Sequence, residues 1–156
     1  MMAVAARGYE GGPGYPVADV LGYLEGRWRV EREVRDLDAG ATGVFRGTGV
    51  FVREAPGGAL THSESGEFTW GGVTRPAYRG HRFEPGPDGT ALVCFADGRP
   101  FHPLDLREGR WTADHPCSAD LYRGEFEVLG PDRWRVVWTV AGPAKRLSLA
   151  TWHDRI

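Results

Sequence analysis

The reactive side chains of this sequence are concentrated between Trp111 and Val128, where the polar run His115-Pro116-Cys117 precedes an alternating stretch. Asp120 and Tyr122 belong to that stretch. In a strand they lie on one face, because successive side chains point to opposite faces. The next residues on this face are glycine, phenylalanine and valine. An apolar surface with an acid and a phenol at one end is typical of the wall of a small-molecule cavity.

These side chains are equipped to move protons. The pKa of a histidine lies near neutrality, so either His115 or Asp120 would act as a general base and Tyr122 as a proton donor. Lys145 is the only lysine in a chain with 18 arginines. A position that needs a compact amine with an adjustable pKa would retain lysine. A single lysine also survives by chance, and both explanations stay open.

Alternation places further polar side chains on the inward faces of other expected strands: Arg32, His62, Glu64 and Arg79. Buried charges are costly unless they are paired, so these groups form either structural ion pairs that close the ends of the fold or a polar pocket. We favour a pocket for a polar or anionic ligand, because several strands contribute to it. In this hypothesis Arg32 and Lys145 hold an anionic or carbonyl group. The apolar wall is formed by Trp28 and Trp138.

The segment from Asp97 to His102 predicts a tight hairpin turn, in which the glycine after Asp97 supplies a positive φ. Asp97 shares a face with the expected core, and Arg99 and His102 follow directly after the turn. We therefore expect Asp97, Arg99 and His102 to form one rim of the cavity mouth. The opposite rim would be formed by His115 and Cys117.

Histidine and cysteine side chains raise two further hypotheses. A zinc site with an open position would need three ligands from one set: His62, His102, His115 and Cys117. No spacing matches a short zinc signature such as H-E-x-x-H, and we predict no metal. The second hypothesis is a Cys117 thiolate activated by His115. In an expected cytoplasmic setting, the two cysteines, Cys94 and Cys117, are predicted to be free thiols.

The composition is that of an ordinary globular protein, with 41% hydrophobic and 26% charged residues and a net charge of -2. Acids and bases are interleaved, so no basic stripe indicates nucleic-acid binding. No window approaches the ~20 apolar residues that span a bilayer, and the N-terminus does not resemble a secretory signal. We expect a cytoplasmic protein whose partner is a small organic ligand rather than nucleic acid or membrane. Monomer and homodimer both stay open.

Turn signals along the chain predict the elements that position these groups. Residues 1–15, rich in glycine and alanine, are expected to form a disordered tail. Residues 16–156 are expected to form a single domain. An amphipathic helix is expected to begin after Pro16 and to end near Gly26. The rest of the chain alternates with period two between glycine, proline and aspartate, which is typical of antiparallel sheet. The expected strands cover residues 27–37, 43–54, 59–67, 75–84, 90–97, 100–106, 110–114, 119–129, 132–141 and 145–154.

Ten short strands without an internal repeat favour an all-β fold, an up-and-down antiparallel barrel of about 8–10 strands, because closure removes exposed edges. A barrel of this size can leave an internal cavity. The run Gly26-Arg27-Trp28, directly after the expected helix, resembles the G-x-W signature at the start of lipocalin-type (calycin) barrels.

The wider pattern resembles an uncharacterised family of small bacterial proteins of unknown function. The resemblance covers residues 20–155 and rests on four motifs: Trp28-Arg-Val-x-Arg32, Phe95-x-Asp97-Gly98-Arg99-x-Phe101-His102, His115-Pro-Cys117-x-x-Asp120-x-Tyr122 and Gly142-Pro-x-Lys145. That family implies no activity. Nitrobindin-like barrels, which bind haem, are a more distant comparison, and no histidine here matches their haem ligand.

These observations lead to one principal hypothesis and two alternatives. The principal hypothesis is a small-molecule-binding barrel that acts as a cofactor-independent acid/base enzyme of the isomerase, cyclase or lyase (dehydratase) type. The sequence has no nucleotide fingerprint or P-loop, and it supplies proton-transfer groups on strands. The first alternative is a ligand carrier or sensor without catalysis. The second is a haem- or metal-binding barrel.

Overall fold

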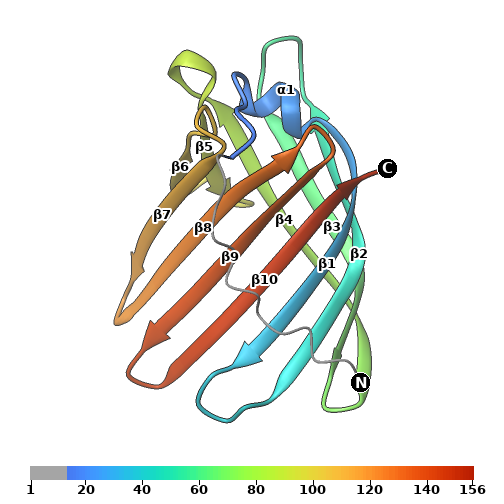
Figure 1. Cartoon of the computed structure of the whole chain (residues 1–156), viewed down its shortest axis with the longest axis vertical. Coiled ribbons are helices and arrows are strands. Elements are labelled where there is room, and N and C mark those ends of the chain that lie inside the picture. Colours follow the sequence, from blue (N-terminus) through green and yellow to red (C-terminus); the bar gives the residue numbers. More distant parts are fainter. Residues whose placement is uncertain (1–13) are drawn as a thin grey trace.

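The computed structural model describes residues 14–156 (Figure 1). This part of the chain forms one short α-helix, one 3-10 turn and ten β-strands. Their bounds are α1 (Val20–Leu24), β1 (Gly26–Asp36), β2 (Thr42–Arg53), β3 (Leu60–Trp70), β4 (Val73–Pro85), η1 (Pro87–Gly89), β5 (Ala91–Phe95), β6 (Pro100–Leu104), β7 (Arg110–Cys117), β8 (Asp120–Gly130), β9 (Arg133–Gly142) and β10 (Lys145–Arg155).

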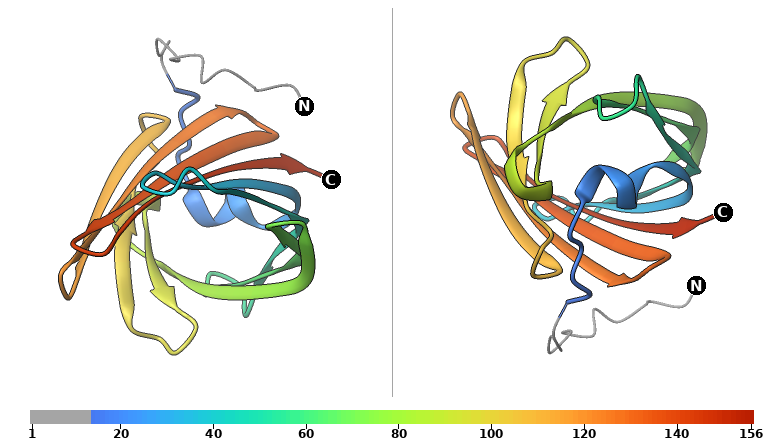
Figure 2. Two further views of the ribbon diagram at one scale, coloured as in Figure 1. Left: turned by 90° about the horizontal axis from the view of Figure 1, so that it is seen from below. Right: turned by 90° about the horizontal axis from the view of Figure 1, so that it is seen from above.

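The ten strands form one antiparallel sheet with the order β6-β5-β4-β3-β2-β1-β10-β9-β8-β7. Neighbours in this order are also neighbours in the chain, except at the seam where β1 pairs with β10. The sheet curls so that its two ends approach each other (Figure 2). The prediction of an all-β, up-and-down calycin-like barrel with a short N-terminal helix is therefore confirmed.

The barrel is nearly rather than fully closed. The end strands β6 and β7 form no ladder with each other in the described part of the chain, although the Trp111 indole Nε1 donates a hydrogen bond to the Pro103 carbonyl across the gap, at 2.8 Å. β4 pairs with β5 only between His81 and Pro85. Its first half therefore has no strand on that side, and this half of β4 borders an opening in the barrel wall.

The helix lies across one end of the barrel (Figure 2). Its residues Val20, Leu21 and Leu24 are buried, and the fully buried Trp28 donates from its indole Nε1 to the Leu24 carbonyl at 2.8 Å. The helix begins later than expected after Pro16, because the preceding residues are extended and Val17 donates its backbone N–H to Leu106, at 2.9 Å. Buried apolar side chains of the helix and of Trp28 therefore close this end of the barrel.

The predicted tail of residues 1–15 falls mainly on residues 1–13, which lie outside the described residues. Within the described chain, the backbone N–H of Tyr15 donates to the Val128 carbonyl at 3.0 Å. Residue 15 is therefore held against β8.

Alternation along β8 puts Glu127 on the outer face of the barrel, but only 7% of it is exposed. Its cross-strand neighbours on β7 and β9 are Arg110 and Arg135. Both donate to its carboxylate, at 3.2 Å and 3.0 Å. The alternation placed Glu127 on the correct outer face, and two long arginine side chains then cover it.

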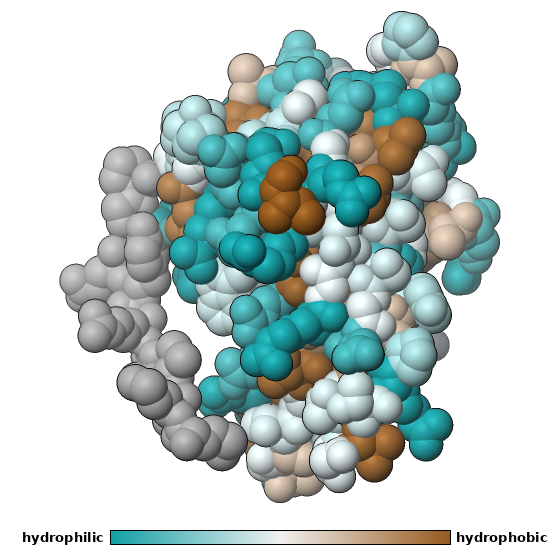
Figure 3. Space-filling view, turned by 90° about the vertical axis from the view of Figure 1, so that its right-hand side faces the viewer, coloured by the Kyte–Doolittle hydropathy of each residue, from teal (hydrophilic) through white to brown (hydrophobic). Residues whose placement is uncertain are grey.

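The outer surface is mainly polar. Figure 3 shows the side of the barrel that lies to the right in Figure 1, where hydrophobic residues are separate rather than gathered into one patch. Isolated exposed apolar residues are normal on soluble folds. Within the described residues, no helix has the length and apolar character needed to cross a membrane.

Gly47 of β2 and Gly66 of β3 face each other where the sheet bends. A Cβ atom at Gly47 would lie 2.7 Å from the Phe45 ring and 2.8 Å from the Gly66 Cα. We expect Gly47→Val to destabilise the fold by about 1–3 kcal/mol, because the two backbones must separate. Urea unfolding measures this loss.

Gly130→Ala is the matched control, because nothing lies within 4 Å of the position of its Cβ atom. Equal stability losses for the two variants would contradict the close approach of β2 and β3.

Candidate ligand-binding cavity

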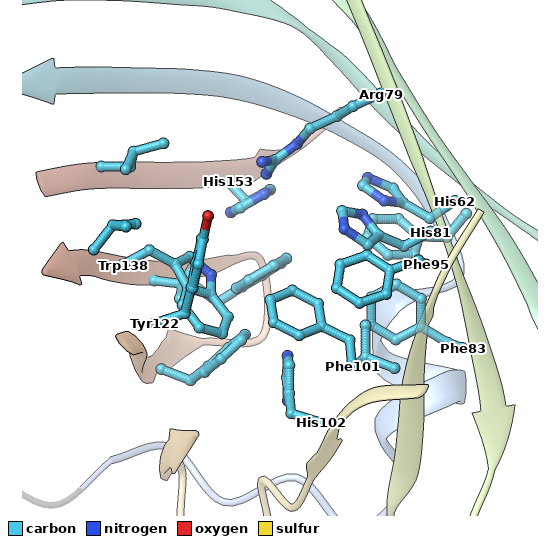
Figure 4. Close-up of a pocket in the computed structure, with 17 residues that line it drawn as sticks. His62, Arg79, His81, Phe83, Phe95, Phe101, His102, Tyr122, Trp138 and His153 are labelled. Atoms are coloured by element: carbon cyan, nitrogen blue, oxygen red, sulfur yellow. The ribbon is translucent and has the colours of Figure 1, made fainter. Parts of the chain in front are cut away.

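The barrel interior contains a cavity of about 250 Å³. Aromatic rings form most of its wall (Figure 4). The side chains that line it with rings are Phe51, His62, His81, Phe83, Phe95, Phe101, His102, Tyr122, Phe126, Trp134, Trp138 and His153. One cation, Arg79, and a few aliphatic residues complete the lining.

Strand register stacks several of these rings face to face. His153 lies directly opposite Trp134 on the β9–β10 ladder, and their rings are parallel within 3° at a centroid distance of 3.6 Å. His62 lies opposite Phe51 on the β2–β3 ladder, with their centroids 4.3 Å apart. Ring pairs of this kind contact each other through their faces and so stiffen an aromatic wall.

The buried histidines are held neutral. Burial, followed by the neighbouring His81, lowers the pKa of His62 to about 3. Burial and the charge of Arg79 lower the pKa of His81 to about 4. The pKa of His153 is also lowered well below the usual value, chiefly by burial. A neutral imidazole has one hydrogen-bond donor and one acceptor, so at neutral pH these rings add polarity to the cavity without charge.

Several polar atoms of the lining have no hydrogen-bond partner among residues 14–156. These atoms are both ring nitrogens of His62, Nδ1 of His153 and the indole Nε1 of Trp134. The great majority of buried polar atoms in folded proteins are paired, so a cluster of exceptions requires an explanation. These atoms expose almost no surface to the cavity, so the side chains packed around them enclose them.

A buried ion-pair network borders the cavity. Arg32 holds Glu64 with two hydrogen bonds, from Nη1 at 2.7 Å and from Nη2 at 2.9 Å, and its Nε donates to Thr151. Arg79 approaches the same carboxylate with its Nε at 3.1 Å. Burial by itself raises the pKa of Glu64, but the hydrogen bonds from Arg32 and the charge of Arg79 outweigh it and hold the pKa below its usual value.

Glycines on β2 make room for this network. Glu64 on β3 reaches Arg32 on β1 across the intervening strand, where the inward positions include Gly47 and Gly49. A Cβ atom at Gly49 would already lie 3.2 Å from the Val30 side chain and 3.6 Å from the His62 ring, so this strand has little room for larger side chains. The sequence presented structural ion pairs and a polar pocket as alternatives. The structure contains the ion pairs, and they lie beside a cavity whose walls are mainly aromatic rings rather than polar groups.

Five of the predicted site residues line the cavity, and they come from separate strands: His62, Arg79, His102, Tyr122 and Trp138. In the structure Arg79 and His81 point inward (Figure 4), whereas Arg82 pairs with Glu54 on the outer side.

Asp120 and Lys145 form an ion pair of their own, with 3.2 Å between Oδ2 and Nζ. They are the first residues of β8 and β10, beside the turns that join the strands, and neither lines the cavity. The Lys145 side chain is 42% exposed. The predicted roles of Asp120 as base and Lys145 as ligand anchor are therefore not supported by contact with the cavity.

Asp97 and Arg99 form the predicted hairpin turn rather than the cavity lining. The Asp97 carboxylate accepts hydrogen bonds from the Arg99 backbone N–H at 3.0 Å and from its Nε at 2.7 Å. Both side chains are more than half exposed. Alternation ends at a turn, so the inward position of Phe95 did not extend to Asp97.

The other predicted residues lie around the cavity without lining it. His115 packs its ring against Phe101 at 5.0 Å and lies 6.4 Å from the Tyr122 ring. Cys117 is exposed and free, and Cys94 is buried and free. Trp28 belongs to the core beneath the helix. Within the described residues no hydrogen bond joins Cys117 to His115, so the activated-thiolate hypothesis gains no support.

The residues present do not fit a resident metal or haem. Within residues 14–156, no three side chains of His, Cys, Asp or Glu are grouped to hold a metal ion. The cavity, at about 250 Å³, is smaller than the ~300–1,000 Å³ typical of pockets for drug-sized ligands. A haem macrocycle would need a larger space.

Two histidines of the cavity, His81 and His153, were not among the predicted site residues. Alternation placed both on inward faces, which was the available signal. Their place in a site depended on which strands meet across the barrel: His81 pairs with His62 on β3, while His153 reaches the cavity from the β1–β10 seam.

The fold and cavity define a calycin-like barrel, and comparison with known proteins places it in a family. Residues 24–155 match the family described as "Family of unknown function (DUF6314)", and the chain belongs to it. The comparison with curated proteins gave no match.

Two solved structures share the fold. The S-type phycobiliprotein lyase from Guillardia theta is 9% identical with a TM-score of 0.64, over 91% of this chain and 93% of that chain. A protein of unknown function of the DUF3598 family from Nostoc punctiforme is 12% identical with a TM-score of 0.51, over 94% of this chain and 53% of that chain. At these identities the likeness concerns the fold alone.

We expect acid to destabilise the protein. The usual histidine pKa is 6.5, and the folded chain keeps His62 and His81 neutral down to about 3 and about 4. The unfolded chain therefore binds more protons below about pH 6.5, and stability falls from there until the folded histidines titrate. Denaturant midpoints between neutral pH and pH 4 measure the fall.

His62→Phe keeps an aromatic ring against Phe51 and removes one titrating group. The dependence of unfolding free energy on pH should become less steep in this variant, by about one proton between pH 4 and 6. An unchanged slope would show that His62 is not buried as a neutral ring.

Proposed function

We propose that this protein binds a small, flat organic molecule inside its barrel. The observation that carries the proposal is the ring-walled cavity, whose lining also includes the polar groups of Arg79, His81 and Tyr122. An apolar cavity with a few converging polar groups is the usual form of a small-molecule site. The rings provide contact area, and the polar groups provide orientation.

The walls also define the shape of the ligand. The Phe101 and Trp138 rings are parallel within 21°, and the Phe95 and Phe101 rings within 15°. Parallel faces favour a planar ring system over a branched aliphatic chain. The volume of about 250 Å³ lies below the range for drug-sized ligands, roughly 300–1,000 Å³, so a bicyclic aromatic compound is a suitable probe.

Val136 lines the middle of the cavity on β9, and its replacement tests the proposal. We expect Val136→Phe to weaken binding of 2-naphthol by about tenfold or more, because the added ring occupies the ligand volume. Quenching of tryptophan fluorescence and isothermal calorimetry measure the affinity.

The matched control is Thr139→Phe, which adds a ring on the exposed side of the same strand. It should bind 2-naphthol like the parent protein. Native mass spectrometry of the freshly purified protein adds an independent readout, the mass of a retained compound. No binding of bicyclic aromatic probes by the parent protein would refute the proposal.

A second candidate function is acid/base catalysis on the bound molecule without an obligatory cofactor. The Tyr122 phenol and the His81 imidazole line the same cavity (Figure 4), and this observation favours it. A neutral imidazole can accept a proton from carbon, and a phenol can donate one to a developing oxyanion. An isomerisation would then return the proton to a different carbon of the same molecule. Asp120 would act indirectly, through its ion pair with Lys145.

Tyr122→Phe distinguishes an enzyme from a carrier or sensor. In an enzyme, turnover of the compound retained on purification should fall by about 100-fold while its binding persists. Nuclear magnetic resonance in D2O would follow both the product and the exchange of carbon-bound protons. A ligand that returns unchanged and without deuterium from the parent protein assigns the carrier function instead.

A further inference from the structure

The charges at the cavity do not cancel. Two arginines, Arg32 and Arg79, share one carboxylate, that of Glu64. The histidines nearby are neutral at neutral pH, because burial lowers their pKa values. The charged groups that shift the pKa of His62 include both arginines and a single carboxylate, that of Glu64. One positive charge is therefore left over in the network.

The surplus charge belongs to Arg79 rather than to Arg32. Arg32 uses Nη1 and Nη2 on Glu64 and its Nε on Thr151, and 7% of its side chain is exposed. Arg79 makes its shortest contact with Glu64 through Nε, at 3.1 Å. Within residues 14–156 its two Nη groups donate no hydrogen bond. The planar fork of an arginine binds a carboxylate through two parallel N–H groups.

Arg79 stands where a ligand would enter. The ladder between β4 and β5 ends at His81, so the strand is unpaired on that side at Arg79, and its side chain is 40% exposed. Figure 4 shows its guanidinium reaching over the cavity from β4. By contrast, Phe51, Phe83 and Trp134 of the lining are buried. A ligand that matches this change from a charged mouth to an apolar interior has an anionic end at the mouth and a flat apolar body inside.

We propose that the ligand is an aromatic monocarboxylate whose carboxylate pairs with Arg79 while its ring system stacks among the aromatic side chains. The proposal rests on the function proposed above and specifies its ligand class. It also corrects the anchors expected from the sequence. Arg32 is already occupied by Glu64, and Lys145, although it lies over the Tyr122 ring, is paired with Asp120 and does not line the cavity.

A single carboxylate suits the site better than a dianionic group. The network has one uncompensated positive charge, so a second negative charge would be left without a partner. The remaining lining residues supply only neutral donors and acceptors, from histidine, tyrosine and tryptophan. These groups would bind neutral polar substituents on the ring.

The test compares 2-naphthoate with 2-naphthamide, which has nearly the same shape and no charge. The parent protein should bind the carboxylate about tenfold more tightly at neutral pH and low salt. Arg79→Gln should abolish this preference, because it weakens the binding of 2-naphthoate and leaves the affinity for 2-naphthamide unchanged. The Arg32–Glu64 pair remains intact in this variant, so its fold is expected to persist, and circular dichroism checks it.

Arg82→Gln is the matched control. It removes the same charge three residues further along β4, from a side chain of similar exposure, 43%, that pairs with Glu54 and Glu84. This variant should retain the preference for the carboxylate.

The outcomes separate the two proposals. Equal affinity of the parent protein for the two compounds would overturn the proposal that the ligand is a monocarboxylate. The proposal that the cavity binds a flat aromatic molecule would remain. A preference that survives Arg79→Gln would remove Arg79 as the anchor. Failure of both compounds to bind would overturn the ligand-binding function itself.

Discussion

The bidentate pair of Arg32 and Glu64 is the interaction on which the interior of this barrel depends. Curling a ten-stranded meander brings the inward faces of all strands into one space, so any inward charge must find its partner there. The pair joins β1 to β3 across the glycines of β2 at 2.7 Å and 2.9 Å. Thr151 on β10 accepts the remaining Nε donor of Arg32, which ties the network to the seam that closes the barrel.

The network also sets the electrostatics of the cavity. A positive charge nearby and a low-dielectric wall both disfavour protonated histidine, so His62, His81 and His153 stay neutral and can stack like aromatic rings. The same surplus charge selects against cations as ligands. Neutral imidazoles and one available guanidinium thus result from one arrangement of charges, and both enter the ligand proposed above.

Much of the site follows from strand alternation, and the errors have local causes. Period two put His62, Glu64, Tyr122 and Trp138 on inward faces, which the structure confirms. Alternation stops at turns, where the chain no longer follows the pleat. The predicted inward positions were therefore least accurate near turns, and Asp97, which was expected at the cavity mouth, is exposed. Proximity along the chain was a further source of error, since the dense cluster after Trp111 contributes one lining residue to the cavity apart from Phe126.

The sequence by itself determined the all-β class, the ten strands, the helix before the first strand and the inward face of most strands, because these depend on local periodicity and turn chemistry. Only the tertiary structure decided which inward residues meet. That required the β1–β10 seam and the short β5 and β6, which leave Arg79 at an opening. Contacts between residues far apart in the chain depend on register and closure of the whole sheet, and no local pattern encodes them.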